Sequence, residues 1–154
     1  MAVRVRCERV GLLLIALAHL GFLVTHDLSH SLAGVPTSPT QLVLIVAVMT
    51  VLPILAVAMA FHKSPRLGAG LFAVAMAASF GFGYLLHFVL GSPELHSNVA
   101  AEHRDLFFHS AQGLAHVEVA GVMYGFAMSV RRRQQEPDRG SPNLWTVPDA
   151  RRSP

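Results

Sequence analysis

The chain has 154 residues, enough for one domain, and hydrophobic residues make up 53% of it. Charged residues make up only 14%, against roughly 25% in a typical soluble domain. The net charge of +3 does not indicate nucleic-acid binding, because the arginines lie at the edges of apolar segments. The single cysteine, Cys7, excludes a disulfide framework and a thiolate metal site within the chain. This composition predicts an integral membrane protein with the lipid bilayer as its main partner.

Four apolar runs follow one another along the chain, at residues 10–28, 42–61, 67–90 and 106–130. Each is close to the roughly 20 residues that an α-helix needs to cross a hydrocarbon core. Segments that contain serine and proline separate the runs, at 34–39, 63–65 and 91–93. Pro53 lies inside the second run and predicts a kink there. We therefore predict an all-α fold, with an integral membrane four-helix bundle over residues 1–133.

Positive charges predict the direction of these spans. Arginines precede the first run, Lys63 and Arg66 lie between the second and third, and Arg131 opens a basic segment after the fourth. All of these fall on one side of a four-span arrangement, and Arg104 alone falls on the other. Because positively charged loops stay in the cytoplasm, we expect the N and C termini to be cytoplasmic. The preference for arginine over lysine suggests a bacterial plasma (inner) membrane.

The two ends of the chain need separate interpretations. The basic start, the first apolar run and Ser31-Leu32-Ala33 also resemble a cleavable signal peptide. Glu8 in the basic region and His19 in the apolar run argue against cleavage. Residues 134–154 are rich in Pro, Arg, Asp, Gly and Ser, a composition that predicts a disordered cytoplasmic tail.

Three of the four runs carry histidines, and two of these runs repeat them at helical spacing. They are His19, His26 and His30 at i, i+7 and i+11 in the first run, His87 in the third, and His109 and His116 at i and i+7 in the fourth. Polar residues inside a membrane are costly and usually face the interior of a helix bundle. The three faces therefore predict a shared polar seam.

The depth of each histidine follows from a rise of about 1.5 Å per residue above the cytoplasmic arginines. This predicts two levels, at about 22–25 Å and about 31–33 Å. The lower level holds His26 and His116, and the upper level holds His30, His87 and His109. Asp27 and Asp105 lie near the upper level, where a carboxylate can bind a metal or orient a histidine ligand.

Two candidate sites follow from these levels. A pair of histidines at one depth can bind a b-type haem axially, and three histidines with carboxylates suit copper, zinc or iron. The candidate haem ligands are His26, His116 and His19, and the candidate metal ligands are His30, His87, His109, Asp27 and Asp105. The sequence carries no phosphate loop, nucleophile elbow, HExxH or CxxC motif that would indicate an enzyme class.

Glu118 is a separate signal within the fourth run, about 20 Å above the inner edge of the membrane. It lies two residues from His116, so the two side chains point to different faces. Gly121 and Gly125 follow it at GxxxG spacing. One interpretation is a proton site, and the other is a protonated side chain that hydrogen-bonds across a tight helix contact or a subunit interface.

Three functional hypotheses follow from the sequence. The leading one is a metal- or haem-binding membrane protein with a redox or electron-transfer role. The first alternative is a proton- or cation-coupled transporter that uses Glu118 and the histidine seam. The second is a non-catalytic accessory subunit of a larger membrane complex, or a homo-oligomer, in which the polar residues serve assembly.

Overall fold

A computed structural model describes residues 2–62, 64–91 and 94–135 of the chain. Within these ranges every regular element is a helix, as predicted. The predicted disordered tail begins at residue 134, and its residues 136–154 lie outside the described part.

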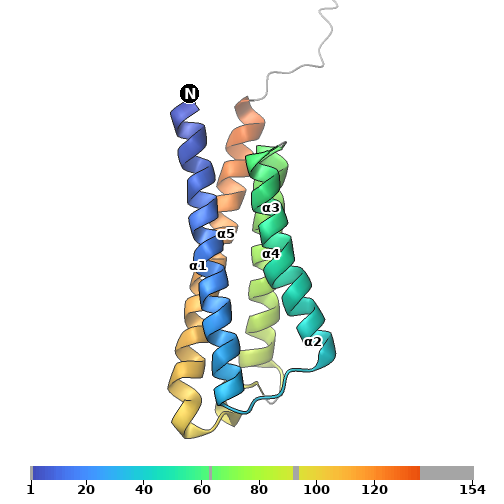
Figure 1. Cartoon of the computed structure of the whole chain (residues 1–154), viewed down its shortest axis with the longest axis vertical. Helices are drawn as coiled ribbons and strands as arrows, with labels where there is room; N and C mark the ends of the chain where they lie inside the picture. Colours follow the sequence, from blue (N-terminus) through green and yellow to red (C-terminus); the bar gives the residue numbers. More distant parts are fainter. Residues whose placement is uncertain (1, 63, 92–93, 136–154) are drawn as a thin grey trace, which may run out of the picture.

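Four helical spans form the bundle (Figure 1). The first is α1 (Ala2–Leu32), and the fourth is α5 (Ala101–Gln135). The second consists of α2 (Pro39–Leu44), the π-helix η1 (Ile45–Val51) and α3 (Leu52–Phe61). The third consists of α4 (Pro65–Tyr84) and the π-helix η2 (Leu85–Val89), and a short 3₁₀ turn, η3 (His96–Asn98), precedes α5. All four spans are long and apolar enough to cross a membrane.

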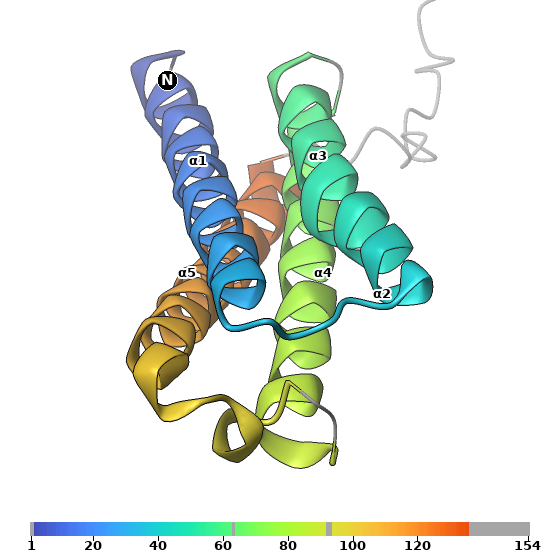
Figure 2. The same cartoon turned by 60° about the horizontal axis from the view of Figure 1, so that its bottom comes forward.

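The connections explain where the spans begin and end. Gly34 follows α1 with a φ of 63°, a conformation that glycine adopts at low cost. Ser38 then caps α2, because its hydroxyl accepts a hydrogen bond from the Gln41 amide and the Gln41 side chain accepts one from the Ser38 amide. The connection between α1 and α2 and the one before α5 lie at one end of the bundle, and the described ends of the chain lie at the other (Figures 1 and 2).

Close packing of α5 against α4 and α1 holds the bundle together. The glycines of the predicted GxxxG pair allow α5 to approach α4 closely. A Cβ atom at Gly125 would lie 2.7 Å from the Ala69 carbonyl oxygen, and one at Gly121 would lie 2.6 Å from the Met76 Cγ. Small residues at such positions let helix backbones come together, so the α4–α5 contact depends on them.

Polar groups lie inside this bundle and large apolar groups lie on its surface. Val24 and Met123 are 69% and 67% exposed, whereas His19 and Ser79 are fully buried. An apolar cluster that includes Leu12, Ala56, Phe72, Met76 and Met128 fills the interior toward the end where the termini lie. Such a distribution is expected of helices whose outer surface faces lipid.

Candidate metal centre

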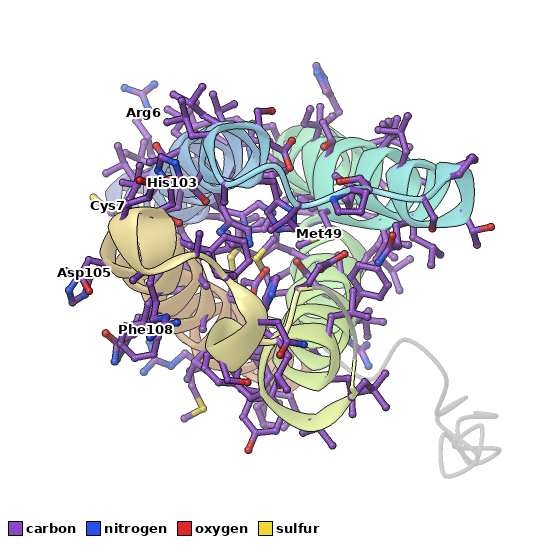
Figure 3. All side chains as sticks on the ribbon, turned by 90° about the horizontal axis from the view of Figure 1, so that it is seen from below. Arg6, Cys7, Met49, His103, Asp105 and Phe108 are labelled. Carbon is purple, nitrogen blue, oxygen red and sulfur yellow. The ribbon has the colours of Figure 1, made fainter. Side chains whose placement is uncertain are left out.

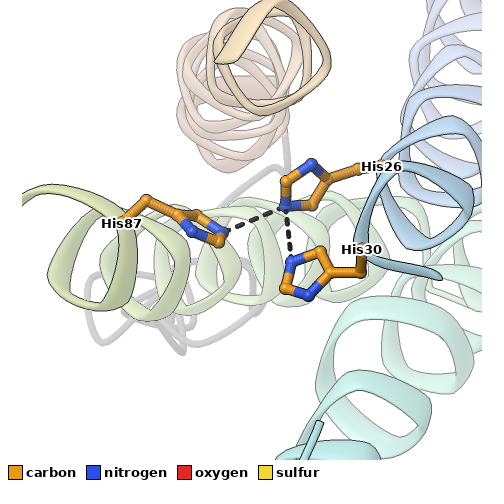
Figure 4. A group of neighbouring side chains, drawn as sticks. All are labelled: His26, His30 and His87. Carbon is orange, nitrogen blue, oxygen red and sulfur yellow. Dashed lines mark hydrogen bonds between the residues drawn. The ribbon is translucent and has the colours of Figure 1, made fainter. Parts of the chain in front are cut away.

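Three histidines meet in the interior near the end opposite the termini. His26 and His30 are one turn apart on α1 and therefore share a face. His87 reaches them from η2 (Figure 4). The Nε2 atom of His26 lies 3.0 Å from the Nε2 of His87 and 3.2 Å from the Nε2 of His30. A ligand atom from each ring lies within 4.8 Å of the other two, so this cluster could hold a metal ion.

The π-helix η2 positions His87. Its wider turn closes with a hydrogen bond of 2.7 Å from the Leu90 amide to the Leu85 carbonyl, and π turns are frequent at functional sites. The Nδ1 atom of His87 lies 3.1 Å from the backbone carbonyl of Glu94. A carbonyl only accepts, so Nδ1 carries the proton and donates. The Nε2 atom of neutral His87 therefore faces the cluster with a lone pair.

Two serines lie against the ring of His26. Ser29 donates to the His26 carbonyl at 2.6 Å, and the Ser110 Oγ lies 3.0 Å from the His26 Nδ1 and 3.1 Å from the Ser29 Oγ. The His26 Nε2 lies 3.0 Å from the lone pair of the His87 Nε2, and either a proton or a metal ion between these two nitrogens satisfies that lone pair. Metal-binding histidines generally donate their other ring nitrogen to a fixed acceptor.

Apolar and acidic side chains surround the cluster. The buried ring of Phe107 lies 5.2, 4.9 and 5.2 Å from the ring centres of His26, His30 and His87, measured between centroids. The Glu94 carboxyl is 4% exposed and lies 3.9 Å from the His87 Nδ1. Burial raises the pKa of Glu94. A hydrogen bond of 2.5 Å from the side-chain Nε2 of Gln41 to the Glu94 Oε1 offsets part of this rise.

A cavity of about 50 Å³ adjoins the cluster. Its walls include the three histidines and Glu94, and it reaches Glu118 further inside the bundle. A water molecule needs roughly 10–15 Å³ of such space, so the cavity has room for an ion with water.

A second polar group lies deeper, at His19. The Nε2 of His19 lies 2.8 Å from the Met49 carbonyl of η1, and its Nδ1 lies 3.8 Å from the Glu118 Oε1. Ser79 of α4 donates a hydrogen bond to the same Glu118 oxygen. The Glu118 carboxyl thus accepts a hydrogen bond across the close α4–α5 contact.

The structure separates several residues that the sequence grouped together. His109 and His116 are exposed on α5, and His116 bonds to the Gln112 carbonyl of its own helix at 2.7 Å. Asp27 is exposed beside the cavity, and Asp105 points away from the bundle, whereas Met49 lies inside it (Figure 3).

The predicted two levels do not hold, because α5 presents a different face and register to its neighbours. Phe107, Ser110, Leu114 and Glu118 form its buried face, and Ser110 rather than His116 lies opposite His26. His26 therefore joins His30 and His87 instead of pairing with His116.

Four polar residues of the site were not predicted: Ser29, Gln41, Glu94 and Ser110. The sequence contained signals for two of them. Ser29 follows His26 by three residues, and Ser110 precedes Glu118 by eight, which places each pair on one helical face. Gln41 and Glu94 lie outside the predicted spans or at their edge, so only the fold brings them to the cluster.

The chain matches no protein-family model, no curated protein and no solved structure. Its function is therefore argued from the chemistry of the site alone.

Proposed function

We propose that this chain is a multi-pass membrane protein that binds one transition-metal ion through the Nε2 atoms of His26, His30 and His87. The convergence of these three atoms carries the proposal. Zinc–imidazole bonds of about 2.0–2.1 Å place neighbouring ligands about 3.3 Å apart in a tetrahedral site. The observed separations of 3.0 and 3.2 Å from His26 are close to that value. The Nδ1 atoms of His26 and His87 already have hydrogen-bond partners, so both rings are held with Nε2 toward the cluster.

The donor set favours copper or zinc. Imidazole suits zinc, copper and iron, and no thiolate contributes, because Cys7 is exposed near the other end of the bundle. Three protein ligands leave a coordination position open toward the cavity, as in catalytic or exchange sites rather than closed structural ones. A redox role follows if the ion is copper or iron.

The membrane setting is part of the proposal. Arg9 of α1 lies next to the end of α3, where its guanidinium donates to the Phe61 carbonyl at 3.2 Å. The start of α4, which carries Arg66, and the last part of α5, which carries Arg131, lie at the same end of the bundle (Figure 1). By the preference of positive charge for the cytoplasm, the metal site then opens toward the opposite, outer side of a bacterial plasma membrane.

Metal analysis of detergent-purified protein tests this function. After equilibrium dialysis against zinc or copper(II), the wild type is expected to retain one ion per chain and to show no Soret band. A variant with alanine at all three histidines is expected to retain none. His116→Ala is the matched control, since its exposed ring lies outside the cluster, and it should retain the ion. Equal metal content in wild type and triple variant would sink the proposal.

A second candidate is proton- or cation-coupled transport, and the cavity favours it. The cavity connects the three-histidine cluster with Glu118, deep in the bundle. Flux measured in proteoliposomes is expected to fall in Glu118→Gln if this candidate holds. Undiminished flux in that variant, or no flux in the wild type, would count against transport while leaving metal binding intact.

A further inference from the structure

The tautomer of His19 is set by a proline on another span. Pro53 has no N–H, so the Met49 carbonyl four residues earlier lacks its α-helical donor. The Nε2–H of His19 takes that place at 2.8 Å, because a carbonyl can only accept. The Nδ1 atom of neutral His19 then carries a lone pair and no proton. It is buried and has no hydrogen-bond partner.

The group that faces this lone pair is a buried carboxyl. Glu118 is 2% exposed, and its Oε1 lies 3.8 Å from the His19 Nδ1. The Ser79 hydroxyl donates to that oxygen, and no lysine or arginine among the described residues pairs with Glu118. An ionised carboxylate beside a lone pair would be uncompensated in an apolar interior. A proton on the carboxyl removes this uncompensated charge.

We propose that His19 and Glu118 form a proton-binding site that holds one proton, on Glu118, and releases it when a cation occupies the three-histidine cluster. The release step rests on the proposed function, whereas the proton site stands without it. His19 lies two turns below His26, about 10 Å away along α1. At that distance a divalent ion in an apolar setting strongly favours an ionised carboxylate as its counter-charge.

The cavity provides the route for the proton. Glu118 lines its inner end, and the histidine cluster and Glu94 line the part near the end opposite the termini. Toward the termini, the apolar cluster around Phe72 and Met76 closes the interior. The released proton therefore leaves toward the same end from which the cation enters. The titratable groups that line or face this cavity, besides Glu118, are His19, His26, Asp27, His30, Tyr84, His87 and Glu94.

Infrared spectroscopy of the metal-free protein tests the proton site. The difference spectrum between wild type and Glu118→Gln at neutral pH is expected to contain the C=O stretch of a protonated carboxylic acid. Glutamine still accepts the Ser79 hydrogen bond, so the variant should fold. Glu102→Gln, at an exposed position of the same helix, should leave the band in place, and His19→Phe should shift it. A spectrum without an acid band assignable to Glu118 would overturn the proton site.

Calorimetric titration with zinc, in buffers of different ionisation enthalpy, tests the release step. The wild type is expected to release about one more proton per zinc ion than Glu118→Gln, which should still bind zinc. Equal proton release in the two proteins would overturn the coupling. Failure of the wild type to bind zinc would overturn the proposed function and the release step together, and the infrared band would then decide the proton site on its own.

Discussion

The Nε2 atoms of His26 and His87 lie 3.0 Å apart, although 61 residues separate these histidines in the chain. The Nδ1 of each ring lies beside a fixed neighbour, the Ser110 hydroxyl for His26 and the Glu94 carbonyl for His87. Both Nε2 atoms therefore face one another, and a proton or a metal ion between them satisfies the His87 lone pair. This contact joins the first span to the third and makes the histidine cluster the centre of the functional account.

Removing any one of the three histidines should weaken metal binding severely. We expect His26→Ala, His30→Ala and His87→Ala each to lower zinc affinity by more than the roughly 10–100-fold that outer hydrogen-bond partners contribute. Competition with a chromophoric chelator measures these affinities. His109→Ala serves as control, because this ring is exposed on α5, and a comparable loss in that variant would contradict the assignment.

Ser110 should affect zinc affinity through its hydrogen bond to the His26 ring. In Ser110→Ala the Nδ1 of His26 loses its 3.0 Å hydrogen-bond partner. We expect zinc affinity to fall about 10–100-fold while one ion per chain is still bound at saturation. The exposed neighbour Gln112 provides the control Gln112→Ala. Unchanged affinity in Ser110→Ala would show that the serine does not orient the ligand.

Metal should stabilise the folded bundle, because its ligands come from two spans that unfolding separates. At a free metal concentration of 100 times Kd, a ligand that binds only the native state adds about 2.7 kcal/mol to the free energy of unfolding. Thermal denaturation in detergent should therefore move to higher temperature with zinc and return after a chelator is added. An equal shift in His87→Ala would mean that zinc acts elsewhere.

The close approach of α4 and α5 should not tolerate a methyl group at Gly125. A Cβ there would lie 2.7 Å from the Ala69 carbonyl oxygen, and backbone cannot move aside as a flexible side chain can. We expect Gly125→Ala to lower the free energy of unfolding by about 1–3 kcal/mol. Gly81→Ala is the matched control on α4, since no atom lies within 4 Å of its added Cβ. Equal denaturation midpoints for the two variants would contradict this packing.

Hydropathy predicted the four spans well because membrane length and apolar composition are properties of single segments. The helices extend beyond these apolar runs, since α1 begins at Ala2 and α5 continues to Gln135 through polar residues. Pro53 indicated an irregular second span, and the structure has the π-helix η1 directly before α3 there. The hydrogen bond from His19 to the Met49 carbonyl could not be predicted, because it depends on α1 lying beside Met49.

The site was harder to predict than the spans, because it depends on how helices face one another. Spacing placed His109 and His116 on one face of α5, but it could not show that the face with Ser110 and Glu118 turns inward. Glu94 reaches the cluster only through the fold of the segment before α5.

X-ray absorption spectroscopy of the zinc- or copper-loaded protein tests whether His26, His30 and His87 bind one ion. We predict one ion per chain with three imidazole nitrogens at about 2.0–2.1 Å and one further light ligand. One imidazole contribution is expected to disappear in His30→Ala and to remain in His116→Ala. A spectrum with fewer than two imidazoles, or one that His30→Ala leaves unchanged, would contradict a metal site at His26, His30 and His87.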